Sequence, residues 1–172
     1  MRNADRKTTK SLSFFNSAFR TPRSALLVTI MGSEHTSEVT IASDLAEARR
    51  VQELVEAALQ SSEYAERDIF AIKLALEEAL VNAIKHGNQM DPDKRVFVVY
   101  RICPKRFEIK ITDEGDGFNP EDVPDPTAIE NLERPCGRGL LLMRGFMTEV
   151  AYHGKGNCVS MALDKNHEPA AG

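Results

Sequence analysis

Three short stretches of the sequence combine residue types that could do chemistry. In the first, "EEALVNAIKHG", Glu78 and Asn82 are four residues apart, and Lys85 and His86 follow. Residues at that spacing lie one above the other on the same face of a helix. An amide oxygen is a suitable ligand for Mg²⁺, and a carboxylate can accept a proton from a hydroxyl nucleophile. A solvated polar helix face with a Glu–Asn contact is the simpler alternative.

The second stretch is "DEGDGF", residues 113–118, directly after the strand-like run "RFEIKIT". Asp113 stands where a strand ends, so its carboxylate can point into a cleft and accept a hydrogen bond from an exocyclic amine. Gly115 and Gly117 let the backbone turn sharply and approach a ligand closely. The alternative is a tight turn that merely exposes acidic side chains, because Asp and Gly are common turn formers.

The third stretch is "GRGLLLM", in which Gly137 and Gly139 precede an expected helix. The first amides of a helix have no intrahelical partner and its dipole favours anions, which is a general way to hold phosphate. Arg134 and Arg138 could add charge-assisted contacts. A flexible junction is the alternative, and the absence of "GxxxxGK[ST]" excludes a P-loop.

The hydrophobic pattern predicts the elements that position these residues. We expect strands at 38–42, 95–103, 106–113, 149–154 and 157–164, and helices at 45–60, 69–87 and 140–150. Ser43 or Asp44 is a natural N-cap for the first helix, and Gly87 is a plausible stop for the second. An inward stripe of the second helix contains Ile69, Ile72, Leu76, Leu80 and Ala83. This order predicts an α+β two-layer sandwich with helices on one face of a mixed, mostly antiparallel sheet.

The chain also divides unevenly along its length. Residues 1–37 hold six Lys and Arg against Asp5 and Glu34, and we expect a flexible basic extension; a natural start at Met31 is the alternative. A single domain is expected at 38–165, followed by a tail at 166–172. Within the domain, residues 114–139 contain four prolines and many acids, and a loop of that length is usually functional or mobile.

Composition excludes several classes of protein. A formal charge of −4 and a pI near 5.6 argue against a dedicated nucleic-acid binder, which needs a concentrated basic surface. Three cysteines at irregular spacing fit a reducing cytoplasm better than a disulfide framework or a zinc site. The longest apolar run, "ALLVTIM", is far shorter than the roughly 20 residues that cross a bilayer. We therefore expect a soluble cytoplasmic protein that contacts neither membrane nor nucleic acid.

Taken in order, "EEALVNAIKHGN", "DEGDGF", a long loop and "GRGLLLM" resemble the GHKL (Bergerat) ATP-binding fold of histidine kinases, gyrase and a class of heat-shock chaperones. The resemblance covers about residues 38–164. With one strand and one helix before the Glu–Asn helix, the chain looks most like the anti-sigma-factor serine/threonine-protein kinases of bacterial partner-switching systems. No helix with a phosphoacceptor His precedes the domain, which disfavours a sensor histidine kinase.

The resemblance implies ATP and Mg²⁺ as cofactors and a role for each motif residue. Glu78 would be the general base and Asn82 the Mg²⁺ ligand, while Asp113 would bind the adenine amino group. The other implied nucleotide contacts are Lys85, His86, Gly115, Gly117, Arg134, Gly137, Arg138 and Gly139, with residues 119–136 as a lid. The family often has an arginine just before the glycines, where this chain has Pro135 and Cys136, so Arg134 or Arg138 would have to serve.

The resemblance also implies partners, namely a STAS-domain anti-anti-sigma protein as substrate and a sigma factor as a bound target, with homodimerisation left open. A module that uses ATP to control partner binding without phosphoryl transfer is the alternative. Glu78 favours the kinase, because a pure binder needs no base there. ATP hydrolysis that drives conformational work is disfavoured, since no transducer domain is visible.

Overall fold

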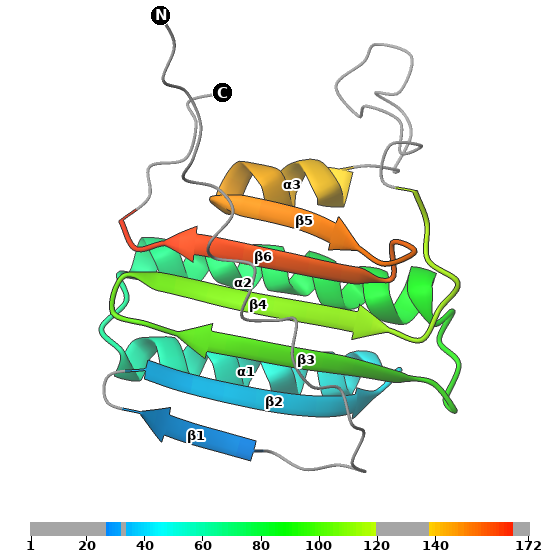
Figure 1. Cartoon of the computed structure of the whole chain (residues 1–172), viewed down its shortest axis with the longest axis horizontal. Helices are drawn as coiled ribbons and strands as arrows, with labels where there is room; N and C mark the ends of the chain where they lie inside the picture. Colours follow the sequence, from blue (N-terminus) through cyan, green and yellow to red (C-terminus); the bar gives the residue numbers. More distant parts are fainter. Residues whose placement is uncertain (1–26, 32–33, 120–137, 167–172) are drawn as a thin grey trace, which may run out of the picture.

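The computed structural model describes residues 27–31, 34–119 and 138–166, which fold into two layers (Figure 1). The strands are β1 (Leu27–Met31), β2 (Glu34–Ala42), β3 (Arg95–Ile102), β4 (Arg106–Asp113), β5 (Glu149–His153) and β6 (Cys158–Asp164). The helices are α1 (Leu45–Ser61), α2 (Glu66–Val81) with its π-helical continuation η2 (Asn82–Gly87), and α3 (Arg138–Phe146).

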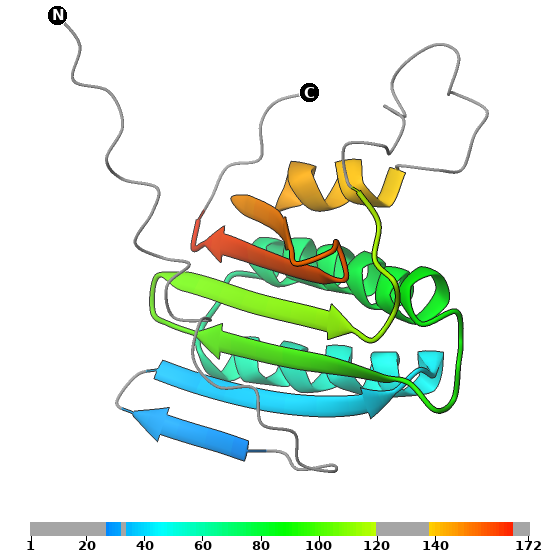
Figure 2. The same ribbon diagram turned by 45° about the vertical axis from the view of Figure 1, so that its right-hand side comes forward.

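One six-stranded sheet forms the first layer, in the order β1-β2-β3-β4-β6-β5. The helices lie together on one face of it, α1 behind β2 and β3, α2 behind β4 and β6, and α3 beside β5 (Figures 1 and 2). The predicted α+β sandwich is confirmed. Every pair among the described strands is antiparallel, so the parallel pairing that a mixed sheet would contain does not occur among them.

The core lies between the two layers and follows the predicted periodicities. Along β3 buried and half-buried residues alternate, because a strand turns successive side chains to opposite faces. The predicted inward stripe of α2 is confirmed, since all five of its residues are buried, Ile69, Ile72, Leu76, Leu80 and Ala83. The helix that carries the Glu–Asn pair is therefore fixed against the sheet along its whole length.

The two candidate N-caps of α1 have different roles. Asp44 is the N-cap, and its Oδ1 accepts a hydrogen bond from the Ala46 amide at 2.7 Å. The Ser43 hydroxyl instead donates to the Lys94 carbonyl at 3.2 Å and accepts from Asn88. Ser43 therefore connects the start of α1 to the loops beside the candidate site.

The element boundaries differ from prediction in three places. Residues 27–31 form β1 and residues 34–37 begin β2, although we assigned them to the extension. The last helix begins at Arg138, so Gly139 lies within its first turn, and it ends at Phe146 because Glu149 already pairs in β5. The end of the predicted 69–87 helix is π-helical, and the Asn88 amide donates to the Ala83 carbonyl at 2.8 Å.

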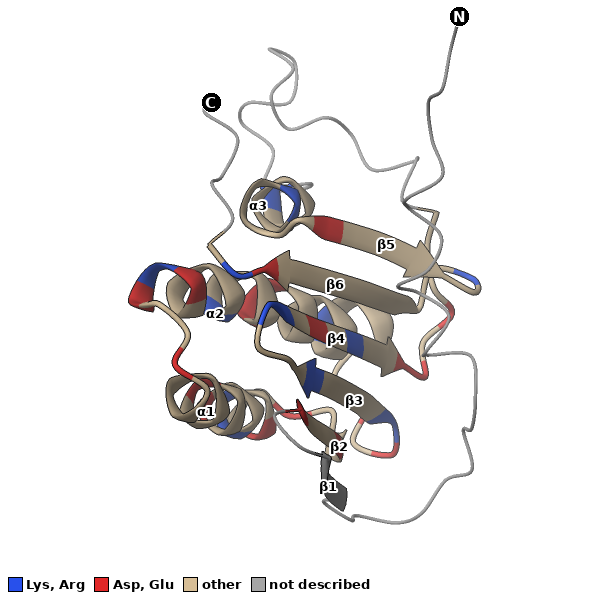
Figure 3. Cartoon of the chain, turned by 60° about the vertical axis from the view of Figure 1, so that its left-hand side comes forward, with Lys and Arg blue, Asp and Glu red and all other residues tan. Residues whose placement is uncertain are grey.

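Charged residues of both signs are distributed over the fold. Lys and Arg are interspersed with Asp and Glu along helices, strands and turns (Figure 3). Within the described ranges, no helix has both the length and the apolar composition needed to cross a membrane.

Candidate functional site

The start of α3 packs directly on the Glu–Asn pair of α2. A methyl group on Gly139 would collide with Oε2 of Glu78 and would lie 3.7 Å from Nδ2 of Asn82. The carboxylate and the amide therefore both face the first turn of α3, where backbone N–H groups have no intrahelical partner. Two stretches more than fifty residues apart in the sequence thus form one cluster, which we call the Glu78 cluster.

The end of η2 and the loop after β4 meet without any side chain between them. The carboxylate of Asp113 fills the space where a Cβ of Gly87 would lie, and a Cβ on Gly115 would overlap the Gly87 carbonyl. Neither glycine has a positive φ, so each is required for space and not for its backbone conformation. Gly87 is the last residue of η2, as predicted, and it is also the floor of a slot that holds Asp113.

Asp113 is nearly buried in this slot, with 9% of its surface exposed. Burial raises the pKa of its carboxyl group, and the Gly115 amide, the backbone amide of Asp113 and nearby Lys155 and Lys94 offset this only in part. Oδ1 accepts the Gly115 N–H at 2.8 Å. An ionised carboxylate has acceptor sites on both oxygens, so Asp113 can also accept a hydrogen bond from a ligand on Oδ2.

Asn88 holds the slot together, and sequence reasoning missed it. Its fully buried side chain donates to Ser43 Oγ at 2.7 Å and to the Arg95 carbonyl at 2.9 Å. Its Oδ1 accepts the Glu114 amide at 2.8 Å. Asn88 thereby connects three chain segments, at Ser43, Arg95 and Glu114. A polar residue directly after the Gly87 stop was the one signal in the sequence.

The turn between β5 and β6 supports the loop after β4 from the other side. Asn157 Nδ2 donates to the Asp113 carbonyl at 2.7 Å, and the Asp113 amide donates to the Asn157 carbonyl at 3.0 Å. Gly117 has a φ of +81° and lies against the Lys155 carbonyl, so here both conformation and space require glycine. The predicted turn role of Gly117 therefore has a structural basis.

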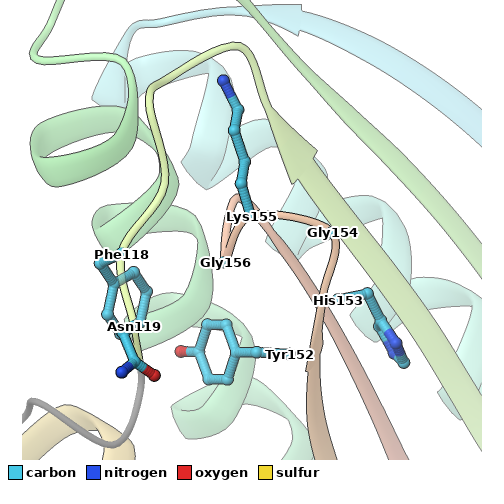
Figure 4. A pocket seen from close by; sticks show the side chains of 7 residues that line it. All are labelled: Phe118, Asn119, Tyr152, His153, Gly154, Lys155 and Gly156. Atoms are coloured by element: carbon cyan, nitrogen blue, oxygen red, sulfur yellow. The ribbon is translucent and has the colours of Figure 1, made fainter.

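A small hollow of 280 Å³ lies beside this turn, lined by residues 118–119 and 152–156. The rings of Phe118 and Tyr152 pack edge to face with centroids 5.0 Å apart. Figure 4 shows these rings together, while Lys155 and His153 extend away from them. The hollow is open to solvent, and neither Glu78 nor Asn82 lines it.

The other predicted site residues are either exposed on the surface or outside the described residues. Lys85 and His86 are exposed on η2, and Arg138 is exposed at the first position of α3. Arg134, Gly137 and residues 120–136 of the expected lid lie outside the described residues, so their roles stay predictions.

The arrangement suits a ligand with an amine at one end and an anion at the other. Gly87 follows Glu78 by nine residues on one continuous helix, which separates the Asp113 slot from the carboxylate by roughly 13 Å. Among the described residues no group of three His, Cys, Asp or Glu could hold a metal ion by itself.

Replacing Asp113 with Asn should stabilise the protein at neutral pH. The raised pKa means that ionisation of Asp113 costs the folded state free energy. This cost is absent below the pKa that Asp113 has in the unfolded chain, and it is fully present above the pKa that it has in the folded protein. The gain of Asp113→Asn over the wild type should thus be present at pH 7.5 and shrink as the pH falls towards 4. Urea unfolding at both pH values measures it. Exposed Asp116→Asn is the matched control, and a variant less stable than the wild type at both pH values would contradict the expectation.

Asn88→Ala should cost about 2 to 4 kcal/mol of unfolding free energy, because a buried side chain loses three hydrogen bonds, to Ser43, the Arg95 carbonyl and the Glu114 amide, at about 0.5 to 1.5 kcal/mol each. Ser43→Ala removes one hydroxyl of the same network and should cost only about 1 kcal/mol. Urea unfolding of both variants at pH 7.5 compares them. Equal costs would mean that Asn88 does not hold the three segments together.

Comparisons with known proteins agree with this geometry. The profile of the family described as histidine kinase-like ATPase domain matches residues 41–163. An anti-sigma F factor of Halalkalibacterium halodurans is 42% identical over 82 residues, which are 46% of this chain and 56% of that protein. The serine-protein kinase RsbW of Bacillus licheniformis is 33% identical over 114 residues, which are 61% of this chain and 70% of that relative.

The fold also has a solved counterpart. The crystal structure of the RsbU and RsbW domains of a Mycobacterium tuberculosis protein matches with a TM-score of 0.53 at 17% identity, covering 76% of this chain and 32% of that one. The chain spans little more than half of the length of the anti-sigma F factor that it matches. The family match spans both halves of the site, from α2 to α3. The chain therefore belongs to the histidine kinase-like ATPase domain family.

Proposed function

We propose that the chain is an ATP-dependent protein serine/threonine kinase that acts as an anti-sigma factor. One observation carries this proposal: the Glu78 carboxylate is held against the first turn of α3, beside the Asn82 amide, with no side chain on Gly139 to separate them. A base, a metal-binding amide and free backbone N–H groups are the parts that phosphoryl transfer to a hydroxyl needs. The relatives named anti-sigma F factor and serine-protein kinase RsbW support the same conclusion.

An ATPase domain binds ATP, and the described residues fit the adenine end and the phosphate end of that molecule. Asp113 would accept the adenine amine on Oδ2 within the slot formed by Gly87 and Gly115. The first turn of α3 would donate backbone N–H groups to the phosphates, with Gly139 allowing close approach. Lys85, His86, Gly117 and Arg138 lie on the elements that border these two ends, and we assign them supporting contacts.

Mg²⁺ would be held by Asn82. Mg²⁺ keeps several water molecules and is usually bound through one or two protein ligands together with substrate phosphates. A single amide oxygen next to Glu78 fits that requirement, and it agrees with the absence of a larger ligand cluster among the described residues. The ion would supply neutralisation of the charge on the transferred phosphoryl group.

In the proposed reaction Glu78 accepts the proton of a serine or threonine hydroxyl. The hydroxyl oxygen forms a bond to the terminal phosphorus of ATP as the bond to the ADP oxygen breaks, so atoms and charge balance. Asn82 and the start of α3 hold the phosphates in place during this exchange. Because Glu78 is anchored on a buried helix, its position is set before the substrate arrives.

The proposed substrate is a STAS-domain anti-anti-sigma protein and the proposed target a sigma factor, in the cytoplasm and without contact to nucleic acid or membrane. A homodimer is part of this proposal, because partner-switching kinases of this kind often act as pairs. The alternative, an ATP-binding module that controls partner binding without phosphoryl transfer, predicts that Glu78 is dispensable.

Glu78→Gln should separate the two functions. The variant should lose phosphoryl transfer by about 10²- to 10⁴-fold, because the amide cannot accept the proton, while its affinity for ATP stays within about threefold of the wild type. Transfer of the terminal phosphate to purified STAS-domain proteins of the same genome measures the first quantity, and isothermal titration with ATP and Mg²⁺ the second.

The matched control is the neighbouring Glu77→Gln, since Glu77 is exposed and should not take part. Wild-type protein that binds ATP but phosphorylates no STAS-domain protein would favour the binding module. Unchanged transfer by Glu78→Gln would remove Glu78 from the role of base.

A further inference from the structure

A row of side chains runs along α2 from an exposed aromatic ring to the proposed base. Phe70, Leu74 and Glu78 follow one another at intervals of four residues, so they form one continuous row on the helix surface. Phe70 is 58% exposed, the highest value among the large hydrophobic residues of the described ranges. Leu74 and Glu78 are half-buried. The row thus changes from apolar to acidic within two helical turns.

The helix α3 runs antiparallel beside this row. At one end Gly139 lies against Glu78, and at the other the ring of Phe146 meets Phe70 edge to face, with centroids 6.3 Å apart and an interplanar angle of 83°. We call Phe70, Leu74 and Phe146 the α2–α3 ridge. The same pair of helices therefore carries the ridge and the proposed base.

The ridge has the properties of a binding hot spot. Burying a large apolar side chain stabilises a complex, and aromatic residues dominate the affinity of many interfaces. The edge-to-face packing already restricts the Phe70 ring, so a partner that covers it would pay little further side-chain entropy.

A protein substrate that reaches Glu78 is large enough to cover the ridge as well. Phe70 precedes Glu78 by eight residues, which is roughly 12 Å along the helix axis. A stable protein interface buries about 800 Å² per partner, equivalent to a disc of about 16 Å radius. An interface of that size centred near Glu78 would include the ridge.

We propose that the α2–α3 ridge is the docking surface for the protein substrate. The occupant is a folded domain whose phosphorylated serine or threonine lies roughly 10 to 15 Å from an exposed apolar patch, the separation set by the helix. This inference rests on the proposed kinase function and adds where its substrate binds. The ridge supplies affinity, and Glu78 supplies chemistry.

Phe70→Ala should raise the KM for the STAS-domain substrate at least about tenfold, with kcat and ATP affinity within about twofold of the wild type. Phe70→Tyr keeps the aromatic ring and should retain the wild-type KM. Leu141→Ala is the matched control, because Leu141 is 47% exposed on α3 but lies roughly 200° around that helix from Gly139 and so faces away from α2. Steady-state phosphorylation of purified STAS-domain proteins, with thermal unfolding of each variant, provides the measurements.

Each outcome decides the inference. An unchanged KM for Phe70→Ala with an active wild type overturns the docking surface and leaves the kinase intact, as does an equal rise in KM for Leu141→Ala. A wild type that binds ATP but transfers no phosphate overturns the kinase and the docking surface with it. If Phe70→Ala converts a dimer to a monomer in light scattering, the ridge is an interface between copies of the chain, which also overturns the proposal.

Discussion

The site depends on one close contact, the approach of the loop after β4 to the end of η2. Asp113 occupies the volume that a side chain on Gly87 would need, and Gly115 lies directly on the Gly87 carbonyl. A Cβ at Gly115 would meet the Gly87 carbonyl and force the backbone to move, whereas a Cβ at Gly87 would displace the Asp113 carboxylate from its place. The contact fixes the position of the Asp113 carboxylate relative to the end of η2, and therefore its distance from Glu78 on α2.

The protein stabilises this contact from both sides because the contact itself is unfavourable. A buried carboxylate loses hydration, which raises the pKa of Asp113, and the backbone amides and lysines near it offset only part of that loss. Asn88 and Asn157 each make hydrogen bonds to backbone beside Asp113, so the cost is met by two side-chain amides that carry no charge. The Asp113 carboxylate is thus held in place with hydrogen-bond acceptor capacity left, as a binding site for an amine requires.

Much of the fold was predictable because its periodicities are local. The alternation of β3 and the inward stripe of α2 follow from the two basic repeats of strand and helix, and both were confirmed. The roles of Gly87 and Asn88 were not predictable in the same way. Both depend on contacts across more than twenty residues, and a glycine that makes room for a distant carboxylate looks in the sequence like any helix stop.

The three chemical stretches have common residue types and were recognisable only from their order along the chain, and only tertiary packing brings them together. The length of α2 with η2 then sets the scale of the site, since one buried helix carries Phe70, Glu78, Asn82 and Gly87 in order. Helical rise fixes the spacing between them, so it cannot change without changing the length of the chain. The loops and partners that face α2 can therefore differ in sequence while the distance from Glu78 to the Asp113 slot stays constant.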